Sequence, residues 1–243
     1  MAGMSTHPRP LLRPAAERFH SRIGWLDSWH SFSFGEHYDP EWTGWNGLVV
    51  VNDDIIREGS GFGEHGHRDM AIITWVLSGE LQHRDSLGNG GVLRAGDTQV
   101  MQAGRGIRHS EFNPSTTEPL HLFQSWVLPV ANGLPPTYDQ RSVPVDERRD
   151  RWAVLADRDG SKGGLVLGAD AVVATAVISP GKTLSRTVEA GRAAWVQVCR
   201  GSGRIGDQAL IAGDGLGLGA GDFTIAADED LEVLVFDLGD RGD

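Results

Sequence analysis

Short apolar runs alternate with glycine-containing turns along most of the chain. The runs lie within 47–56, 70–89, 91–113 and 120–129, and the turns among them include SGE, SLGN and AGD. Strand-length runs at such close spacing are typical of β-barrels and β-sandwiches, whereas a fold of alternating strands and helices needs longer connections. The pattern therefore predicts an all-β protein.

The chain changes character over 131–150, where a Pro-Pro pair is followed by dense charge. We interpret this stretch as the link between two domains. We expect a first barrel over 1–140, a connector over 141–150 and a second barrel over 151–243. Strand-like runs return after the connector, and the best short helix candidate is 147–157.

The two predicted barrels share an order of elements. The segment WVQVCRGSGRIGDQALIAGDGLGL (195–218) echoes WVLSGELQHRDSLGNGGVLRAGDTQV (75–100). In both, a strand enters a glycine turn, a second strand follows, and Ala-Gly-Asp comes next. Internal similarity of this kind indicates two copies of one β-barrel unit.

Composition and charge exclude some classes of function. The formal net charge is −11 and no run of lysine or arginine stands out, so we expect no direct binding to nucleic acid, which needs a basic face. No stretch approaches 18 apolar residues, and the first 20 residues look like a loose, proline-containing lead-in, so we expect no membrane association. The single cysteine, Cys199, fits a reducing cytoplasm, where we place the protein.

Two short motifs carry candidate metal ligands. Alternate residues of a strand project from the same face, so His65 and His67 must project together, as must His109 and Glu111. On neighbouring strands of a barrel, the two pairs would surround one point with three imidazoles and a carboxylate. Such ligands suit Fe, Mn, Co, Ni, Cu or Zn, and they leave two positions open on a six-coordinate ion. Taken alone, each pair fits polar surface residues as well.

The surrounding spacing favours the metal interpretation. Gly59, five further residues and His-x-His match the first motif of the cupin barrels. Gly106-x-x-His109-x-x-x-Asn113 matches the end of the second cupin motif, and Gly96-Asp97 fits its start. The interval between the motifs leaves room for the strands that a barrel requires.

The stretch from GFGEHGHRDM to GIRHSEFNPS (61–115) resembles the pirin family of the cupin superfamily, in particular its bacterial quercetin 2,3-dioxygenase-like branch. Further matching segments are GWLDSWHSFSFGEHYDP (24–40), LVVVNDD (48–54) and HLFQSWVLP (121–129). The resemblance therefore spans nearly the whole chain.

This resemblance implies a bicupin fold with one divalent metal ion held by His65, His67, His109 and Glu111. The metal of pirins is usually iron, so we expect Fe(II), with Ni, Mn, Co, Cu and Zn left open. The resemblance also implies opening of a flavonol such as quercetin by O₂, with release of carbon monoxide and a depside. Glu111, the only carboxylate of the set, is our candidate base for the flavonol 3-hydroxyl.

Two other functions stay open. Some pirins are thought to be iron-holding, redox-sensitive regulators of a protein partner, and flavonol breakdown would then be incidental. A closed tetrahedral shell of three histidines and one glutamate would instead be a structural zinc site.

Two positions depart from the family pattern. Ala71 stands where cupins usually carry a glutamate and pirins commonly an acid, so we expect a charge to be missing beside the site. Gly66 separates the two histidines, where proline is common. No histidine follows His121, so we expect the second barrel, 151–243, to hold no metal.

Some further polar residues have weaker interpretations. We expect Asp85 and Ser86 to cap a turn, with His83 beside it and not a ligand. Gln124 is a candidate to reach the N–H of a ligand imidazole.

Two more groups are ambiguous. Asp53 and Asp54 follow an apolar run, and we expect them to cap a turn. Phe62, Met101 and Phe123 fit either the wall of an apolar pocket or the core.

Overall fold

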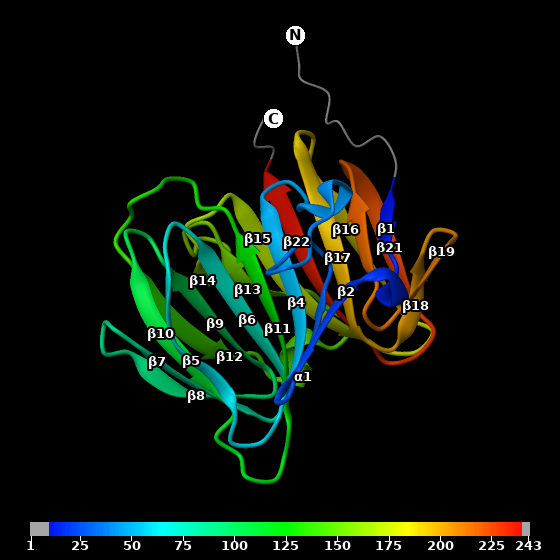
Figure 1. Ribbon diagram of the computed structural model, residues 1–243. Coiled ribbons are helices and arrows are strands. Elements are labelled where there is room, and N and C mark those ends of the chain that lie inside the picture. Colours follow the sequence, from blue (N-terminus) through cyan, green and yellow to red (C-terminus); the bar gives the residue numbers. More distant parts are fainter. Residues whose placement is uncertain (1–9, 240–243) are drawn as a thin grey trace.

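β-Strands form almost all of the regular structure (Figure 1). The computed structural model describes residues 10–239, whose strands make two seven-stranded and two four-stranded sheets. The helical segments are the 3₁₀ turns η1 (Ala15–Glu17) and η2 (Pro40–Trp42) and the helix α1 (Val145–Arg148). None of the described residues belongs to a helix long and apolar enough to cross a membrane. The prediction of an all-β protein is confirmed.

The first half of the chain supplies one sheet of each size. The larger sheet has the order β12-β9-β6-β11-β4-β3-β2, and the smaller has the order β5-β10-β7-β8. The larger sheet comprises β2 (Phe19–Ile23), β3 (Leu26–His30), β4 (Leu48–Ile56), β6 (Ala71–Ser78), β9 (Asp97–Gln102), β11 (Leu120–Val127) and β12 (Thr137–Ser142). The smaller sheet comprises β5 (Gly61–His67), β7 (Glu80–Asp85), β8 (Gly90–Arg94) and β10 (Ile107–Phe112).

The second half supplies the other two sheets, with the orders β1-β20-β17-β22-β15-β13-β14 and β16-β21-β18-β19. The larger comprises β1 (Leu11–Arg13), β13 (Ala153–Asp157), β14 (Leu165–Val166), β15 (Ala171–Ile178), β17 (Arg192–Arg200), β20 (Gly215–Leu218) and β22 (Leu231–Gly239). The smaller comprises β16 (Thr183–Val188), β18 (Ser202–Ile205), β19 (Gln208–Ile211) and β21 (Gly221–Ala227).

Both halves repeat one arrangement. In the first, β6 pairs with β9 in the larger sheet, and the hairpin β7–β8 between them belongs to the smaller sheet. In the second, β17 pairs with β20, and the hairpin β18–β19 belongs to the smaller sheet. These strands coincide with the two similar sequence segments, so the predicted duplication is confirmed.

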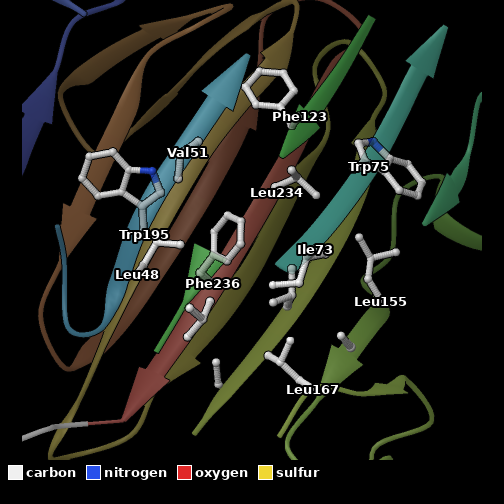
Figure 2. Close-up of a cluster of buried hydrophobic side chains, with 14 of the residues drawn as sticks. Leu48, Val51, Ile73, Trp75, Phe123, Leu155, Leu167, Trp195, Leu234 and Phe236 are labelled. Atoms are coloured by element: carbon white, nitrogen blue, oxygen red, sulfur yellow. The ribbon is translucent and has the colours of Figure 1, made fainter. Parts of the chain in front are cut away.

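The two seven-stranded sheets pack face to face and enclose the largest apolar core of the described residues (Figure 2). Trp75 and Phe123 enter it from the first half, and Leu234 and Phe236 enter it from β22. All four side chains are at most 2% exposed. One face of each large sheet is therefore devoted to joining the halves, and only the other face lines a barrel interior.

The two barrel interiors differ in polarity. Fully buried Ile225 and Val235 belong to an apolar cluster inside the second half. In the first half, alternate residues along β6 are Ile72, Thr74 and Val76, and the two apolar ones belong to different clusters. Thr74 thus marks a polar layer across an otherwise apolar interior, and this layer contains the candidate site.

The predicted lead-in over the first 20 residues was wrong from Leu11 onward, and residues 1–9 lie outside the described part of the chain. β1 pairs with β20 in the second half, and η1 then leads to β2 in the first half. The chain therefore contributes a strand to the far sheet before it enters the near one.

The sequence interpretation missed two strands beside the link between the halves. β12 lies inside the stretch 131–150 and pairs along its whole length with β9. The helix expected over 147–157 is only the single turn α1, after which β13 pairs with β15. Pairing with a neighbouring strand outweighs the weak local helix propensity.

Truncating a side chain in the core between the sheets should destabilise the protein. Leu234→Ala is expected to lower the free energy of unfolding by about 2–5 kcal/mol, because Leu234 is buried between the two large sheets. The control Ile211→Ala, at a side chain that is 58% exposed, should change it by less than about 0.5 kcal/mol. Urea unfolding measures both values, and equal effects would contradict the packing described.

Candidate metal centre

The four candidate ligands lie on two paired strands, β5 and β10. The antiparallel register places His109 opposite His65, and a bulge follows between His109 and Glu111. His109 and Glu111 are buried, whereas His65 and His67 are half-buried. Gly61 allows the strands to approach closely at the bulge, because a Cβ there would lie 2.2 Å from the Glu111 carbonyl oxygen.

Three imidazoles converge between these strands. The Nε2 atoms of His65 and His109 are 3.0 Å apart, and the ring of His67 lies 4.8 Å and 4.9 Å from theirs, between centroids. His65 Nδ1 lies 2.8 Å from the Gly63 carbonyl oxygen. A carbonyl only accepts, so Nδ1 carries the proton and Nε2 offers a lone pair to the site. Nε2 of His67 is buried without a hydrogen-bond partner.

Burial keeps two of these imidazoles neutral. It lowers the pKa of His67 to about 4, an effect that the neighbouring rings of His109 and His65 reinforce. It lowers the pKa of His109 to about 3, reinforced by His65 and His83. Neutral imidazole is the form that binds metal ions, so both rings are in the binding form at neutral pH without having to lose a proton.

Two glutamine side chains hold the carboxylate of Glu111. Gln99 Nε2 donates to Oε1 at 2.7 Å, and Gln124 Nε2 donates to Oε2 at 2.8 Å. The expectation that Gln124 contacts a ligand imidazole was therefore wrong, because its amide binds the carboxylate. Gln99 was missed in the sequence because its place on the inner face of β9 depends on the register with β6.

His83 lies inside the site, which the sequence interpretation missed. It is fully buried, opposite Glu111 in the register of β7 and β10, and it stacks on Tyr138 with ring centroids 4.3 Å apart. Its Nε2 is 3.5 Å from Asp85 Oδ2, at the outer limit of a hydrogen bond, and neither ring nitrogen has a well-formed partner. Asp85 does cap the turn, accepting from the backbone N–H groups of Leu87 and Asn89, as predicted.

The donor set fits a divalent metal ion. Ligand atoms of His65, His67 and His109 lie within 4.8 Å of one another, and those of His83, His109 and Glu111 do the same. The two groups share His109. A buried ring nitrogen without a partner costs free energy, and a cation held by the first group would satisfy Nε2 of His67. Imidazole nitrogen with carboxylate oxygen suits first-row divalent metals.

A hollow of about 360 Å³ opens beside the site. Its lining includes His67, Ile107 and the basic side chains Arg68 and Arg108. Arg108 also pairs with Glu64 at 2.8 Å. The volume lies within the range of small-molecule sites, and the lining is basic at its outer part.

The apolar pocket wall that was one of two interpretations of Phe62, Met101 and Phe123 does not line this hollow. Met101 and Phe123 are fully buried core residues, and Phe62 packs edge-on against Trp25 at 4.9 Å between ring centroids. The alternative interpretation, core packing, describes all three.

Ala71 does not lie beside the histidines. Its side chain belongs to the core between the two large sheets, on the opposite face of β6 from Thr74. The expectation of a charge missing from the site was therefore wrong, because this position faces away from it.

A buried polar network lies next to the site on β3 and β4. Ser28 donates to Asp54, and His30 Nδ1 lies 2.8 Å from Asn52 Oδ1. The pKa of Asp54 is raised to about 7, mainly by burial, with a smaller contribution from the charges of Asp53 and Glu111 and against the opposing hydrogen bond from Ser28.

Asp53 and Asp54 both lie within β4, so the prediction that they cap a turn was wrong. Asp53 faces the other side of the sheet, where it pairs with Arg18 at 3.0 Å and His121 at 2.6 Å.

Comparison with known proteins assigns the family. Residues 13–127 match the pirin family, and residues 154–238 match the family described as quercetinase C-terminal cupin domain. Quercetin 2,3-dioxygenase of Escherichia coli (strain K12) is 44% identical over 228 residues, 93% of this chain and 97% of the relative. A putative quercetin 2,3-dioxygenase of Mycobacterium tuberculosis (strain H37Rv) is 46% identical over 176 residues, 72% of each protein.

A solved structure supports the same family. The crystal structure of the bacterial pirin YhhW from Escherichia coli in complex with nickel(II) has a TM-score of 0.90 and 42% identity, and covers 95% of this chain and 99% of that one. The fold places the chain among the bicupin proteins. The chain belongs to the pirin family, in the branch that contains bacterial quercetin 2,3-dioxygenases.

The buried carboxyl of Asp54 predicts an unusual dependence of stability on pH. Its pKa is higher in the folded protein (about 7) than in the unfolded chain (3.8), so this group stabilises the fold at low pH and loses that effect as the pH rises towards 8. Asp54→Asn should therefore be more stable than the wild type at pH 8, by up to about 4 kcal/mol, and the difference should shrink towards pH 4.

Urea unfolding of both proteins from pH 4 to pH 8 measures this difference. Asp53→Asn is the matched control and should destabilise the protein at pH 8, because it removes the ion pair with Arg18. A difference for Asp54→Asn that stays constant with pH would contradict the assignment.

Proposed function

We propose that the protein is a metal-dependent quercetin 2,3-dioxygenase-like enzyme with a mononuclear site formed by His65, His67, His109 and Glu111. The observation that carries the proposal is the convergence of the imidazoles of His65, His67 and His109, together with a second group in which His109 lies beside Glu111 and His83. The 44% identity to a quercetin 2,3-dioxygenase over 93% of the chain supports a flavonol and O₂ as the substrates.

The donor set supports a divalent metal, and we propose Fe(II) as the native ion. Nickel(II) in the structure of the Escherichia coli relative supports the wider choice of Ni, Mn, Co, Cu or Zn. When bound, the metal would supply a Lewis acid that orients the flavonol and O₂ and favours electron transfer between them.

The side chains of this chain would bind the metal, orient the flavonol and accept its proton. The three histidines hold fixed positions, and burial keeps His67 and His109 neutral. Glu111 would accept the proton of the flavonol 3-hydroxyl at a carboxylate oxygen. Each of its oxygens uses one lone pair for a glutamine N–H, so a second lone pair stays available.

The basic hollow beside His67 suits a polyphenol. Phenolate oxygens would be attracted by Arg68 and Arg108, and the hollow has the volume of a small-molecule site. Arg68 and Arg108 are exposed, so they would act on binding rather than on the chemistry.

We place the metal in the first half alone, and we place the boundary of the two barrels at the connector 141–150. The smaller sheet of the second half turns buried Phe223 and Ile225 inward on β21, where β10 of the first half carries His109 and Glu111. Aliphatic and aromatic side chains offer no ligand atoms. The single cysteine, Cys199, is free and buried, which fits the cytoplasmic location that we propose.

A second candidate is an iron-holding, redox-sensitive regulator of a protein partner. The observation that favours it is the charged lining of the hollow, since a charged surface beside the site is what a partner would contact.

The metal-loaded protein should consume quercetin in air. Turnover is followed by the loss of flavonol absorbance, with a chelated sample as the blank and metal content measured in parallel. His65→Ala should reduce the rate at least about 100-fold, because it removes a ligand whose Nε2 points at His109. His20→Ala, which removes an imidazole on the exposed strand β2, is the control and should keep the wild-type rate. Wild-type turnover no faster than that of the chelated sample or of His65→Ala would contradict the enzyme and favour the regulator.

A further inference from the structure

Gln99 and Gln124 contact the same carboxylate from two different strands, β9 and β11. Each places its amide nitrogen within 2.8 Å of one oxygen of Glu111. Gln99 is 1% exposed, and its amide also reaches Thr74 Oγ1 at 3.2 Å. Two donors on opposite oxygens restrict rotation of the carboxylate more than a single one would.

The direction of each amide is fixed by a second hydrogen bond. Trp126 Nε1, which can only donate, lies 3.0 Å from Gln124 Oε1. The Tyr138 hydroxyl lies 3.0 Å from Gln99 Oε1 and 2.8 Å from Gln140 Oε1. The hydroxyl has one proton to donate. The exposed side chain of Gln140 can turn its NH₂ group towards the hydroxyl oxygen and donate to it. The proton is therefore available to Gln99, whose NH₂ then faces Glu111.

We infer that Gln99 and Gln124 are positioning residues that hold the Glu111 carboxylate in place, so that it serves the metal and the substrate without leaving its position. This inference rests on the proposed ligand set. Each donor occupies one lone pair on one oxygen of the carboxylate. A second lone pair on each oxygen stays available, and a swinging carboxylate would have to break both hydrogen bonds.

The test is a set of glutamine-to-methionine variants, which keep side-chain length and remove the N–H donors. Gln99→Met and Gln124→Met should each weaken Co(II) binding about 10- to 100-fold, measured by competition with a chelator. The matched control is Gln102→Met, at a buried glutamine on the same strand as Gln99 that faces the second half near Leu167. It should leave Co(II) affinity unchanged. Circular dichroism and thermal melting confirm that each variant is folded.

A double-variant cycle separates positioning from a general structural effect. In a Glu111→Ala background, Gln99→Met should cause no further loss of Co(II) affinity, because the carboxylate it holds is gone. Should Gln99→Met fail to fold, Tyr138→Phe keeps the ring that stacks on His83 and removes only the donor that orients Gln99. It should weaken Co(II) binding in the same direction by a smaller factor.

The outcomes are distinct. Co(II) affinity of Gln99→Met or Gln124→Met equal to that of Gln102→Met overturns the inference and leaves the ligand set intact. An undiminished loss in the Glu111→Ala background also overturns it. Wild-type affinity in Glu111→Ala alone overturns the ligand set and, with it, the inference.

Discussion

A buried carboxylate surrounded by buried imidazoles needs partners that water no longer provides. Unpaired polar groups inside a protein cost free energy, and charged groups cost more. Glu111 receives two amide donors from the protein, whereas Nε2 of His67 and Nδ1 of His109 receive none. A divalent cation would satisfy lone pairs on nitrogen and oxygen together. The polar layer of the first half is arranged around this requirement.

The architecture supplies the stability that such a layer needs. The two large sheets pack over a continuous apolar core, in which Trp75 and Phe236 are buried from opposite sides. That core uses only one face of each large sheet, so the inner face of the first is free to carry Thr74, Gln99 and Gln124. The second half uses the same strand order but fills its interior with apolar side chains. The first unit thus carries a polar layer, and its copy has an apolar interior.

The sequence predicts part of the fold and part of the site, and there are physical reasons why it does not predict the rest. The alternation of apolar runs with glycine turns and the internal repeat predict a fold of two similar β units, because both are local signals in the sequence. Spacing also brings His65 and His67 together, because alternation on one strand is local. Contacts set by the register between strands are not local. His83, Gln99 and Tyr138 reach the site only through the pairing of β7 with β10 and of β9 with β6 and β12.

The sequence also does not show which side of a sheet a side chain faces. Ala71 follows His67 by four residues yet faces the core between the sheets, because the chain turns between β5 and β6. The strands β1, β12 and β13 were missed because their partners are distant in the chain or their sequences are polar. Edge strands have weak patterns of their own, and pairing decides them.

The central claim is that one metal ion sits between β5 and β10 in the first half. Anomalous diffraction from crystals of the protein loaded with Co(II) tests it most directly. We predict one peak per chain, at about 2.0–2.2 Å from one atom each of His65, His67, His109 and Glu111. A peak bound through His83 in place of His65 and His67, a peak in the second half, or no peak at all would contradict the account.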